Sequence, residues 1–508
     1  MEQQNETVQR GRTGERKLLE YGTVILTVAC SYLVSRLFRL ENNAAGMSCL
    51  RMVVLFLVTV GAVVVTRYLL TEKSLQREDN QIIVLIMVMG TAVRIIYMLY
   101  TACTTRSHDL WEISTDSYGH AAYILHIMQL KQLPQSNWIQ FYQQPFFYFS
   151  GSVVSGIING ILGCNDPYYL VDATKVVSCI ASCVSLMAGR EIFEECHLTG
   201  KGLCRSMLLI SFLPVTYLTG ARVCPDALAG MFMVLAFLYT LRWLREQSWK
   251  NTIVLAFIYG FGVMTKISCA VMALFTGIIF IGCFWKAIRL KREKKDNQSW
   301  KSLMVRYLVF GCISLPLGLW YGIRNYVRFR QPLQYVVEIP KTNSIYTGDI
   351  SLFRRILWID WKNLLDSPYT AVREDYNLPV YAVKSSLFGE FQYEVPLWLP
   401  RTLLFFACLL TAFCVVAIVK YGMDLYKGQK KEQNCNLALL AAVIFYGSIL
   451  SFYVRYPFGC SMDFRYMLFL PVPIAAILGK TQWKYPATGL YLDLCCIGFM
   501  AASCMMFC

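Results

Sequence analysis

The sequence predicts an all-α polytopic membrane protein, a bundle of about 13 transmembrane helices. The chain of 508 residues is 56% hydrophobic and only 16% charged, with a mean hydropathy of +0.45. That composition is too apolar for a soluble fold of this length. Nearly uncharged runs of about 17–23 residues recur along the chain, and about 20 helical residues cross a hydrocarbon core. Backbone amides in lipid must bond within their own segment, so each run is a helix.

The stretch 145–163 is the one apolar segment whose path is ambiguous, because four glycines interrupt it. If every basic cluster lies in the cytoplasm, an even number of spans separates residues 80 and 242. Four predicted spans separate these residues if 145–163 is not counted as a span, and five if it is. We therefore expect 145–163 to be a re-entrant or interfacial segment on the outer side. The predicted spans are 20–38, 50–70, 82–103, 168–189, 204–220, 226–243, 252–266, 268–285, 304–323, 399–419, 437–454, 465–479 and 486–507.

The net charge of +16 comes from clusters of Lys and Arg in short loops between the spans. The loop 286–306 alone carries eight of these residues. Basic loops of this kind are typical of the cytoplasmic side of membrane proteins, so we expect no nucleic-acid partner. The polar, basic start of the chain runs into a full-length span, which predicts a signal anchor. Most cysteines fall in apolar runs and no C-x-x-C pair occurs, so a zinc site has no support.

The same parity argument places several connecting segments together on the outer face. They are the loop 104–145, the turns around Asp226 and Lys266, the loop 325–397 and the turn 455–464. One of them, 325–397, carries eight basic and eight acidic residues and is too long for a simple connector. The chain therefore divides into an N-terminal tail with the first helices, a catalytic transmembrane module with the first outer loop, an extracytoplasmic loop, and C-terminal helices. Their ranges are 1–103, 104–324, 325–398 and 399–508.

The first outer loop holds the densest group of polar residues, including His108, Asp109, Asp116 and His120. Apolar residues recur at helical spacing after Asp116 until Pro134, which predicts an amphipathic helix lying along the membrane. A carboxylate near its N-terminus is favoured by the helix dipole. The simpler alternative is a helix cap in a solvated loop. Metal-ligand spacing is not evident among these acids.

Charged residues also mark the outer ends of later spans. Asp226 follows Pro225 at the start of one span, where it either caps the helix or serves a site. Lys266 lies between two apolar runs and either snorkels to water or faces an anionic phosphate. Near the end, Asp463, Arg465 and Tyr466 form either an interfacial ion pair or a phosphate site in which Asp463 orients Arg465.

These residues resemble motifs of the C-superfamily membrane glycosyltransferases (GT-C), in particular the bacterial family 39-like relatives of protein O-mannosyltransferases. The ordered series extends over about residues 82–480. The chain departs from the family at two positions: Gln144 stands where the family often has His, and Pro225 stands where Asn is common. The matching segments are Asp116–Ile124, Phe141–Tyr148, Pro225-Asp226, Thr265-Lys266, Trp320–Tyr326, Ser386–Glu390 and Asp463–Tyr466.

The resemblance implies a GT-C-like bundle with juxtamembrane helices on the outer face, which transfers a sugar, with inversion, from a polyprenyl-phosphate-linked donor to a glycan, lipid or protein acceptor. Asp116 is then the general base, with Asp109 as the second candidate, and Arg465 and Lys266 bind donor phosphate. His108, His120, Asp226, Glu390, Asp463 and Tyr466 complete the expected substrate-binding set. No cofactor is implied; a divalent metal is compatible with the resemblance but is not indicated by the residues. A bacterial cell membrane with an outward-facing site is the expected location.

Two other classes fit the topology. A polysaccharide polymerase or ligase also has many spans and one large outer loop, and would rely on basic groups of 325–397. A secondary transporter would need charged groups within the membrane, for which Asp172, Lys175 and Asp493 are the candidates. The absence of an internal repeat in the sequence weakens the transporter interpretation.

Overall fold

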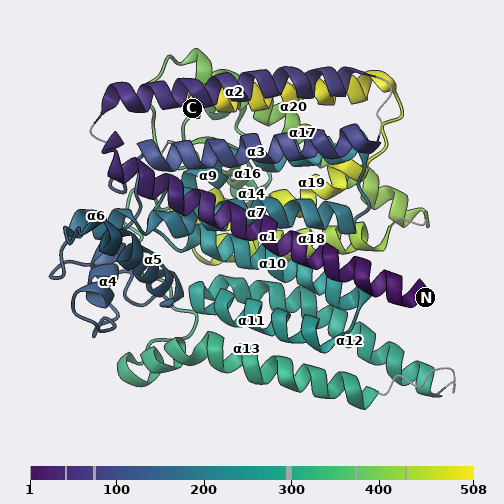
Figure 1. The fold of residues 1–508 in the computed structure, drawn as a ribbon, viewed down its shortest axis with the longest axis horizontal. Helices are drawn as coiled ribbons and strands as arrows, with labels where there is room; N and C mark the ends of the chain where they lie inside the picture. Colours follow the sequence, from purple (N-terminus) through teal and green to yellow (C-terminus); the bar gives the residue numbers. More distant parts are fainter. Residues whose placement is uncertain (1, 41–42, 72–75, 293–299, 372–373, 430–431) are drawn as a thin grey trace.

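The computed structural model describes residues 2–40, 43–71, 76–292, 300–371, 374–429 and 432–508, and this part of the chain is helical (Figure 1). Part of the predicted basic loop 286–306, residues 293–299, lies outside the described residues. The first ten helices are α1 (Glu2–Leu37), α2 (Ala44–Leu70), α3 (Gln76–Tyr100), α4 (Gly119–Met128), α5 (Phe146–Leu162), α6 (Pro167–Asp172), α7 (Lys175–Glu195), α8 (Gly200–Phe212), α9 (Pro214–Gly220) and α10 (Asp226–Arg245).

The second half of the chain continues the bundle and adds short helices within the long loop. Its elements are α11 (Trp249–Thr265), η2 (Ile267–Ala270), α12 (Val271–Arg292), α13 (Trp300–Phe329), α14 (Leu352–Ile356), α15 (Trp361–Asp366), α16 (Leu378–Phe388), α17 (Trp398–Tyr426), α18 (Gln433–Arg455), η3 (Gly459–Met462), η4 (Phe464–Met467), α19 (Pro471–Lys480) and α20 (Pro486–Phe507). Among the described residues, pairing outside helices is limited to one isolated bridge, Tyr346 with Phe458.

The helices confirm an all-α membrane bundle, with a somewhat smaller number of full spans than the sequence predicts. By length and apolar composition, 10 described helices can cross a membrane, or up to 12 if two bent pairs each count as one span. Helix α11, the predicted span 252–266, has only 17 residues. Prolines explain both breaks, because Pro214 and Pro471 lack the N–H that would continue the preceding helix. The bends there measure 43° and 59°.

The ambiguous stretch 145–163 forms a 17-residue helix, α5. It gathers with α4 and α6 at one end of the bundle, at the left of Figure 1. Its side chains Val153, Ile157 and Ile161, spaced four residues apart, are all about 60% exposed, at 62%, 60% and 64%. Helix α5 therefore presents one apolar stripe away from the protein, as expected of a helix that contacts lipid.

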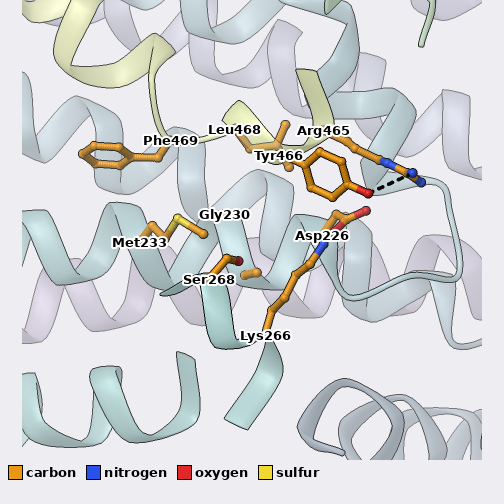
Figure 2. A pocket seen from close by; sticks show the side chains of 10 residues that line it. Asp226, Gly230, Met233, Lys266, Ser268, Arg465, Tyr466, Leu468 and Phe469 are labelled. Atoms are coloured by element: carbon orange, nitrogen blue, oxygen red, sulfur yellow. Dashed lines mark hydrogen bonds and ion pairs between the residues drawn. The ribbon is translucent and has the colours of Figure 1, made fainter. Parts of the chain in front are cut away.

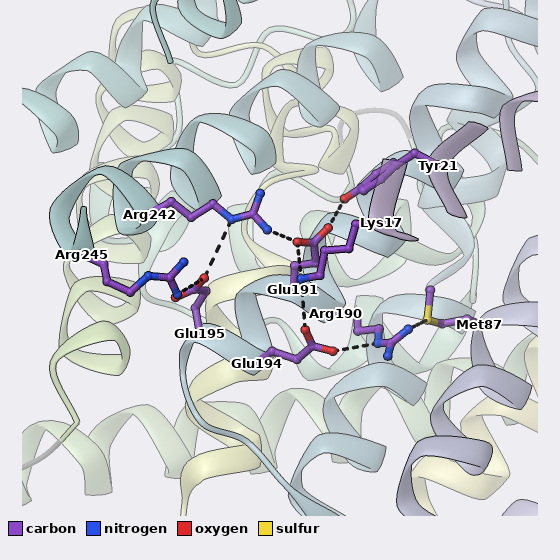
Figure 3. A network of polar contacts seen from close by, with 9 residues as sticks. All are labelled: Lys17, Tyr21, Met87, Arg190, Glu191, Glu194, Glu195, Arg242 and Arg245. Atoms are coloured by element: carbon purple, nitrogen blue, oxygen red, sulfur yellow. Dashed lines mark hydrogen bonds and ion pairs between the residues drawn. The ribbon is translucent and has the colours of Figure 1, made fainter. Parts of the chain in front are cut away.

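Near the C-terminal ends of α7 and α10, ion pairs connect these two helices with α1 (Figure 3). The Glu191 carboxylate of α7 accepts hydrogen bonds from Lys17 (2.9 Å) and from the Tyr21 hydroxyl (2.7 Å), both on α1. The same carboxylate pairs with Arg242 of α10. We call this the basic end of the bundle, defined by Lys17, Arg190, Arg242 and Arg245. Its charge matches the bias expected of a cytoplasmic edge.

The charged residues considered for a transporter form buried pairs between helices. Asp172 pairs with Lys175 at 2.9 Å and accepts the Tyr32 hydroxyl at 2.6 Å. Asp493 of α20 pairs with Arg205 of α8 at 2.7 Å. Because each charge already has an opposite partner within the bundle, these groups explain helix packing without a transport pathway.

Candidate active site

Residues 101–118, here called the first loop, fold back against the start of α4. The Asp109 carbonyl oxygen accepts the backbone N–H of His120 at 2.9 Å. Asp109 and Trp111 have φ values of 54° and 58°, a left-handed conformation that residues other than glycine rarely adopt. Strained backbone persists only where surrounding contacts hold it, and it is concentrated at functional sites. The loop therefore holds Asp109 in one defined position.

Gly119, at the start of α4, makes this close approach possible. Its φ is +83°, and a Cβ atom there would lie under 3.0 Å from the Asp109 carbonyl oxygen and from the Trp111 side chain. Gly163 has a similar φ of +61°, but no atom lies within 4 Å of the position that a Cβ atom would take there. The two glycines share a left-handed backbone and differ in whether a side chain would clash.

We expect Gly119→Ala to destabilise the protein more than Gly163→Ala. Both changes place a side chain on a left-handed backbone, at a cost of about 1–2 kcal/mol. Only Gly119→Ala adds overpacking, which costs a further ~1–3 kcal/mol, and it should displace the first loop. Thermal unfolding of purified variants, with limited proteolysis of the first loop, measures the difference. Equal unfolding temperatures and equal cleavage would contradict the role assigned to Gly119.

Two further segments meet at the same end of the bundle as the first loop. Asp226 begins α10 directly after Pro225 and is buried, at 6% exposed. Lys266 lies at the break between α11 and η2, in extended backbone. Its ammonium pairs with the Asp226 carboxylate and lies 4.5 Å from the centre of the Tyr466 ring. The break directs the Lys266 side chain toward the start of α10, as Figure 2 shows.

The turn between η3 and η4 adds a second cation. The Asp463 carboxylate accepts the backbone N–H of Arg465 at 3.0 Å and thereby caps η4. The guanidinium of Arg465 donates to the Tyr466 hydroxyl at 3.1 Å (Figure 2), and its Nε atom lies 3.3 Å from Asp463 Oδ2. Asp226, Lys266, Arg465 and Tyr466 line one pocket. This pocket therefore combines one carboxylate with two cations.

His108 and Glu390 lie on the other side of Asp463. The His108 Nε2 atom is 3.5 Å from Glu390 Oε2 and 3.9 Å from Asp463 Oδ2. Burial lowers the pKa of His108 far below its usual value, and the charges of Arg465 and Arg222 lower it further. The imidazole is therefore neutral. The remaining Glu390 oxygen accepts the Tyr381 hydroxyl at 2.7 Å.

Asp109 lies at the edge of these charges. Its side chain is exposed, yet desolvation by the surrounding protein raises the pKa of the carboxyl above its ordinary value. The charge of Arg465 opposes this rise, Asp226 adds to it, and Lys266 again opposes it. A carboxyl with a raised pKa is a better proton acceptor than an ordinary aspartate. Asp109 is therefore electrostatically part of the cluster.

The structure places Asp116 differently. Its side chain is exposed, and its backbone N–H bonds the Ser114 hydroxyl at 3.2 Å. Within the described residues, no ion pair or side-chain hydrogen bond joins Asp116 to the cluster. The helix predicted after Asp116 is present as α4, but residues 119–125 are all buried, so α4 is not the amphipathic surface helix that the sequence predicts. Packing of α4 beneath the first loop explains the difference.

His120 is also close to the cluster. It is 3% exposed, its Nδ1 atom lies 2.8 Å from the Tyr148 hydroxyl, and burial lowers its pKa to about 3, with Asp226 opposing and Lys266 adding to the effect. The structure thus brings together nine of the ten residues considered from the sequence, all except Asp116. They are His108, Asp109, His120, Asp226, Lys266, Glu390, Asp463, Arg465 and Tyr466.

Sequence reasoning assigned no role to Arg222 or Tyr381. Arg222 is 5% exposed and stacks on the Phe391 ring at 4.7 Å. A single arginine in an otherwise apolar stretch just before Asp226 is the signal that could have found it. Tyr381 has no such signal, because its role depends on α16 packing beside the η3–η4 turn. The Ser385 hydroxyl of α16 accepts the Phe464 N–H at 3.0 Å and fixes that contact.

Comparison with known proteins gives one family match over part of the chain. Residues 172–314 match the family model described as dolichyl-phosphate-mannose-protein mannosyltransferase. The chain resembles the GT-C membrane glycosyltransferases. The match includes Asp226 and Lys266 and excludes the first loop and the η3–η4 turn. It supports an integral, multi-pass membrane glycosyltransferase. No curated protein matches the chain.

Two solved structures of the Archaeoglobus fulgidus oligosaccharyltransferase are also similar, one in the apo form and one tethered to an acceptor peptide. Each has a TM-score of 0.44 and 10% sequence identity. The alignment covers 83% of this chain and 55% of the oligosaccharyltransferase, so this chain spans about half the length of that enzyme.

Proposed function

We propose that this protein transfers a sugar from a polyprenyl-phosphate-linked donor to an acceptor hydroxyl on the extracytoplasmic face. The observation that carries the proposal is the meeting of Asp226 with two cations, Lys266 and Arg465, which come from three separate segments and line one pocket, with the Asp109 carboxyl electrostatically coupled to all three. A carboxylate beside paired cations suits a reaction that removes a proton from one reactant and releases an anionic phosphate from the other. The family description, which names a lipid-phosphate-linked sugar, supports the same donor class.

The chemistry follows from the charges. The Asp109 carboxylate takes the proton of the acceptor hydroxyl, whose oxygen attacks the anomeric carbon of the donor sugar. The bond from that carbon to the phosphate oxygen breaks, and polyprenyl phosphate departs with the bonding electrons. Arg465 and Lys266 stabilise the charge on this phosphate. Asp226, paired with Lys266, holds the ammonium in position. One displacement of this kind inverts the configuration of the sugar.

Two features support the expected side of the membrane and the lipid nature of the donor. The cluster lies at the end of α10 opposite the basic end, which has the charge of a cytoplasmic edge. The apolar stripe lies on α5, whose first residue Phe146 stacks on Phe261 of α11 at 4.7 Å between ring centres, and α11 ends directly before Lys266. A polyprenyl chain can lie along that stripe while its phosphate reaches the cations.

The proposal predicts transfer from lipid-linked sugars and not from nucleotide sugars. Purified protein in lipid nanodiscs would be incubated with a panel of radiolabelled polyprenyl-phosphate sugars, or with the matching nucleotide sugars, and extracts containing glycan, lipid and protein acceptors. Labelled acceptor is expected with at least one lipid-linked donor, and the label should be lost in Asp226→Asn. Transfer from nucleotide sugars alone would contradict the donor assignment. Uptake of sugar into proteoliposomes without any transfer would favour a transporter.

A further inference from the structure

His108, Glu390 and Asp463 form a ligand set suited to a metal ion. Among the described residues, one ligand atom from each lies within 4.8 Å of the other two. They come from three segments: the first loop, the end of α16 and the η3–η4 turn. One imidazole nitrogen and two carboxylates on separate segments can converge on a single divalent cation.

Two of these atoms are buried without a hydrogen bond. His108 Nε2 and Asp463 Oδ2 have no hydrogen-bond partner among the described residues. Asp463 is 0% exposed, so water does not compensate its carboxylate from outside. The nearest cation, Arg465 Nε, lies 3.3 Å from that oxygen but also lacks a hydrogen bond. Buried polar atoms normally have partners, and two unpartnered buried atoms only 3.9 Å apart are the arrangement expected of a ligand site.

The surrounding charges indicate what such an ion would do. Glu390 and Asp463 supply two negative charges. Arg465 lies beside Asp463, and Arg222 stacks on Phe391, whose ring is 4.8 Å from the His108 ring. These two guanidinium groups balance the two carboxylates. A divalent cation therefore makes the cluster positive, and an anionic group beside it restores neutrality.

We propose that His108, Glu390 and Asp463 bind one divalent cation of the Mn²⁺ or Zn²⁺ type, which shares a phosphate with Arg465. The mixed nitrogen and oxygen ligands favour these ions over Mg²⁺ or Ca²⁺, which prefer oxygen alone. Binding of the ion follows from the geometry by itself. Sharing of the phosphate rests on the proposed function, since it requires a phosphate-linked donor at Arg465.

The site is tested by metal binding, independently of sugar transfer. Full-length protein in nanodiscs would be treated with EDTA, dialysed, and titrated with Mn²⁺ while the free ion is measured by electron paramagnetic resonance. We expect one ion per chain at this site, with affinity at least about tenfold weaker in His108→Ala and in Glu390→Gln. Cys196→Ser is the matched control, because Cys196, Glu432 and Cys435 form the other candidate group among the described residues. It should leave Mn²⁺ affinity unchanged.

Failure to bind Mn²⁺ in the unmodified protein would overturn the metal site, as would unchanged binding in both ligand variants. Thermal unfolding of each variant separates loss of a ligand from loss of the fold. Adding polyprenyl phosphate without sugar should tighten Mn²⁺ binding by about tenfold, and Mn²⁺ should tighten lipid-phosphate binding equally. Unchanged affinity would overturn the shared phosphate. If Mn²⁺ binds as expected but no lipid-linked sugar is transferred, the proposed function fails and the metal site stands.

Discussion

Asp109→Asn is expected to lower sugar transfer by about 100-fold or more, since a positioned general base contributes roughly 10²–10⁴-fold. Asn keeps the size of the side chain and cannot accept the proton of the acceptor hydroxyl. The raised pKa of Asp109 adds a pH signature. The base works only when deprotonated, so transfer by the unmodified protein should fall with decreasing pH, beginning above the ordinary aspartate pKa of about 3.9. Initial rates in nanodiscs across a pH series measure both effects.

Asp116→Asn is the matched control for this experiment. Both acids lie on the first loop and both side chains are exposed, but only the Asp109 carboxyl is coupled to Arg465, Asp226 and Lys266. Replacement of Asp116 should therefore leave the rate within about twofold, as is usual for exposed positions away from a site. The opposite result, a normal rate in Asp109→Asn and loss of transfer in Asp116→Asn, would return the general base to Asp116. Equal rates in all three proteins would remove both carboxylates from the mechanism.

Arg465→Ala is expected to weaken use of the donor strongly. Removing one group that stabilises developing negative charge typically costs about 10²–10³-fold in rate, and loss of a phosphate contact also raises the donor concentration required. Arg465→Lys keeps the charge but loses the fork that can contact two phosphate oxygens, so its defect should be intermediate. Donor titrations at saturating acceptor, giving kcat and KM separately, provide the measurement.

Arg328→Ala serves as the control, since Arg328 is an exposed arginine at the end of α13 whose guanidinium bonds the Gln135 side chain at 3.0 Å, away from the cluster. It should leave donor use unchanged. Because the Arg465 side chain is only 10% exposed and pairs with the buried Asp463, the unfolding temperature of each variant must accompany the kinetics. A stable Arg465→Ala protein with an unchanged donor KM and kcat would show that Arg465 does not bind the phosphate.

The membrane helices were predictable because their signal is local. Each needs only a run of apolar residues, and the prolines that bend two of them, Pro214 and Pro471, are visible in the sequence. The grouping of Asp226, Lys266 and Arg465 was also accessible, because charge bias and parity place the ends of their spans on one side. These inferences require no knowledge of which helices are neighbours.

The choice between Asp109 and Asp116 was not accessible in this way. Helical spacing after Asp116 suggested a surface helix, whereas α4 packs inward, and Asp109 has a left-handed backbone and a carboxyl coupled to Arg465, Asp226 and Lys266. The positive φ values and the Gly119 contact depend on tertiary packing. The approach of Glu390 to His108 likewise depends on α16 docking beside the η3–η4 turn, which joins residues nearly 300 positions apart.

Helix α10 connects the candidate active site with the basic end of the bundle over a fixed length. Its first residue is Asp226, and Arg242 in its last turn is held by Glu191, which also binds Lys17 of α1. Twenty residues rise about 30 Å, close to the thickness of a bilayer's hydrocarbon core. Anchoring one end of this helix therefore fixes the height of the Asp226 carboxylate at the other end, and with it the height of the Lys266 ammonium that pairs with Asp226.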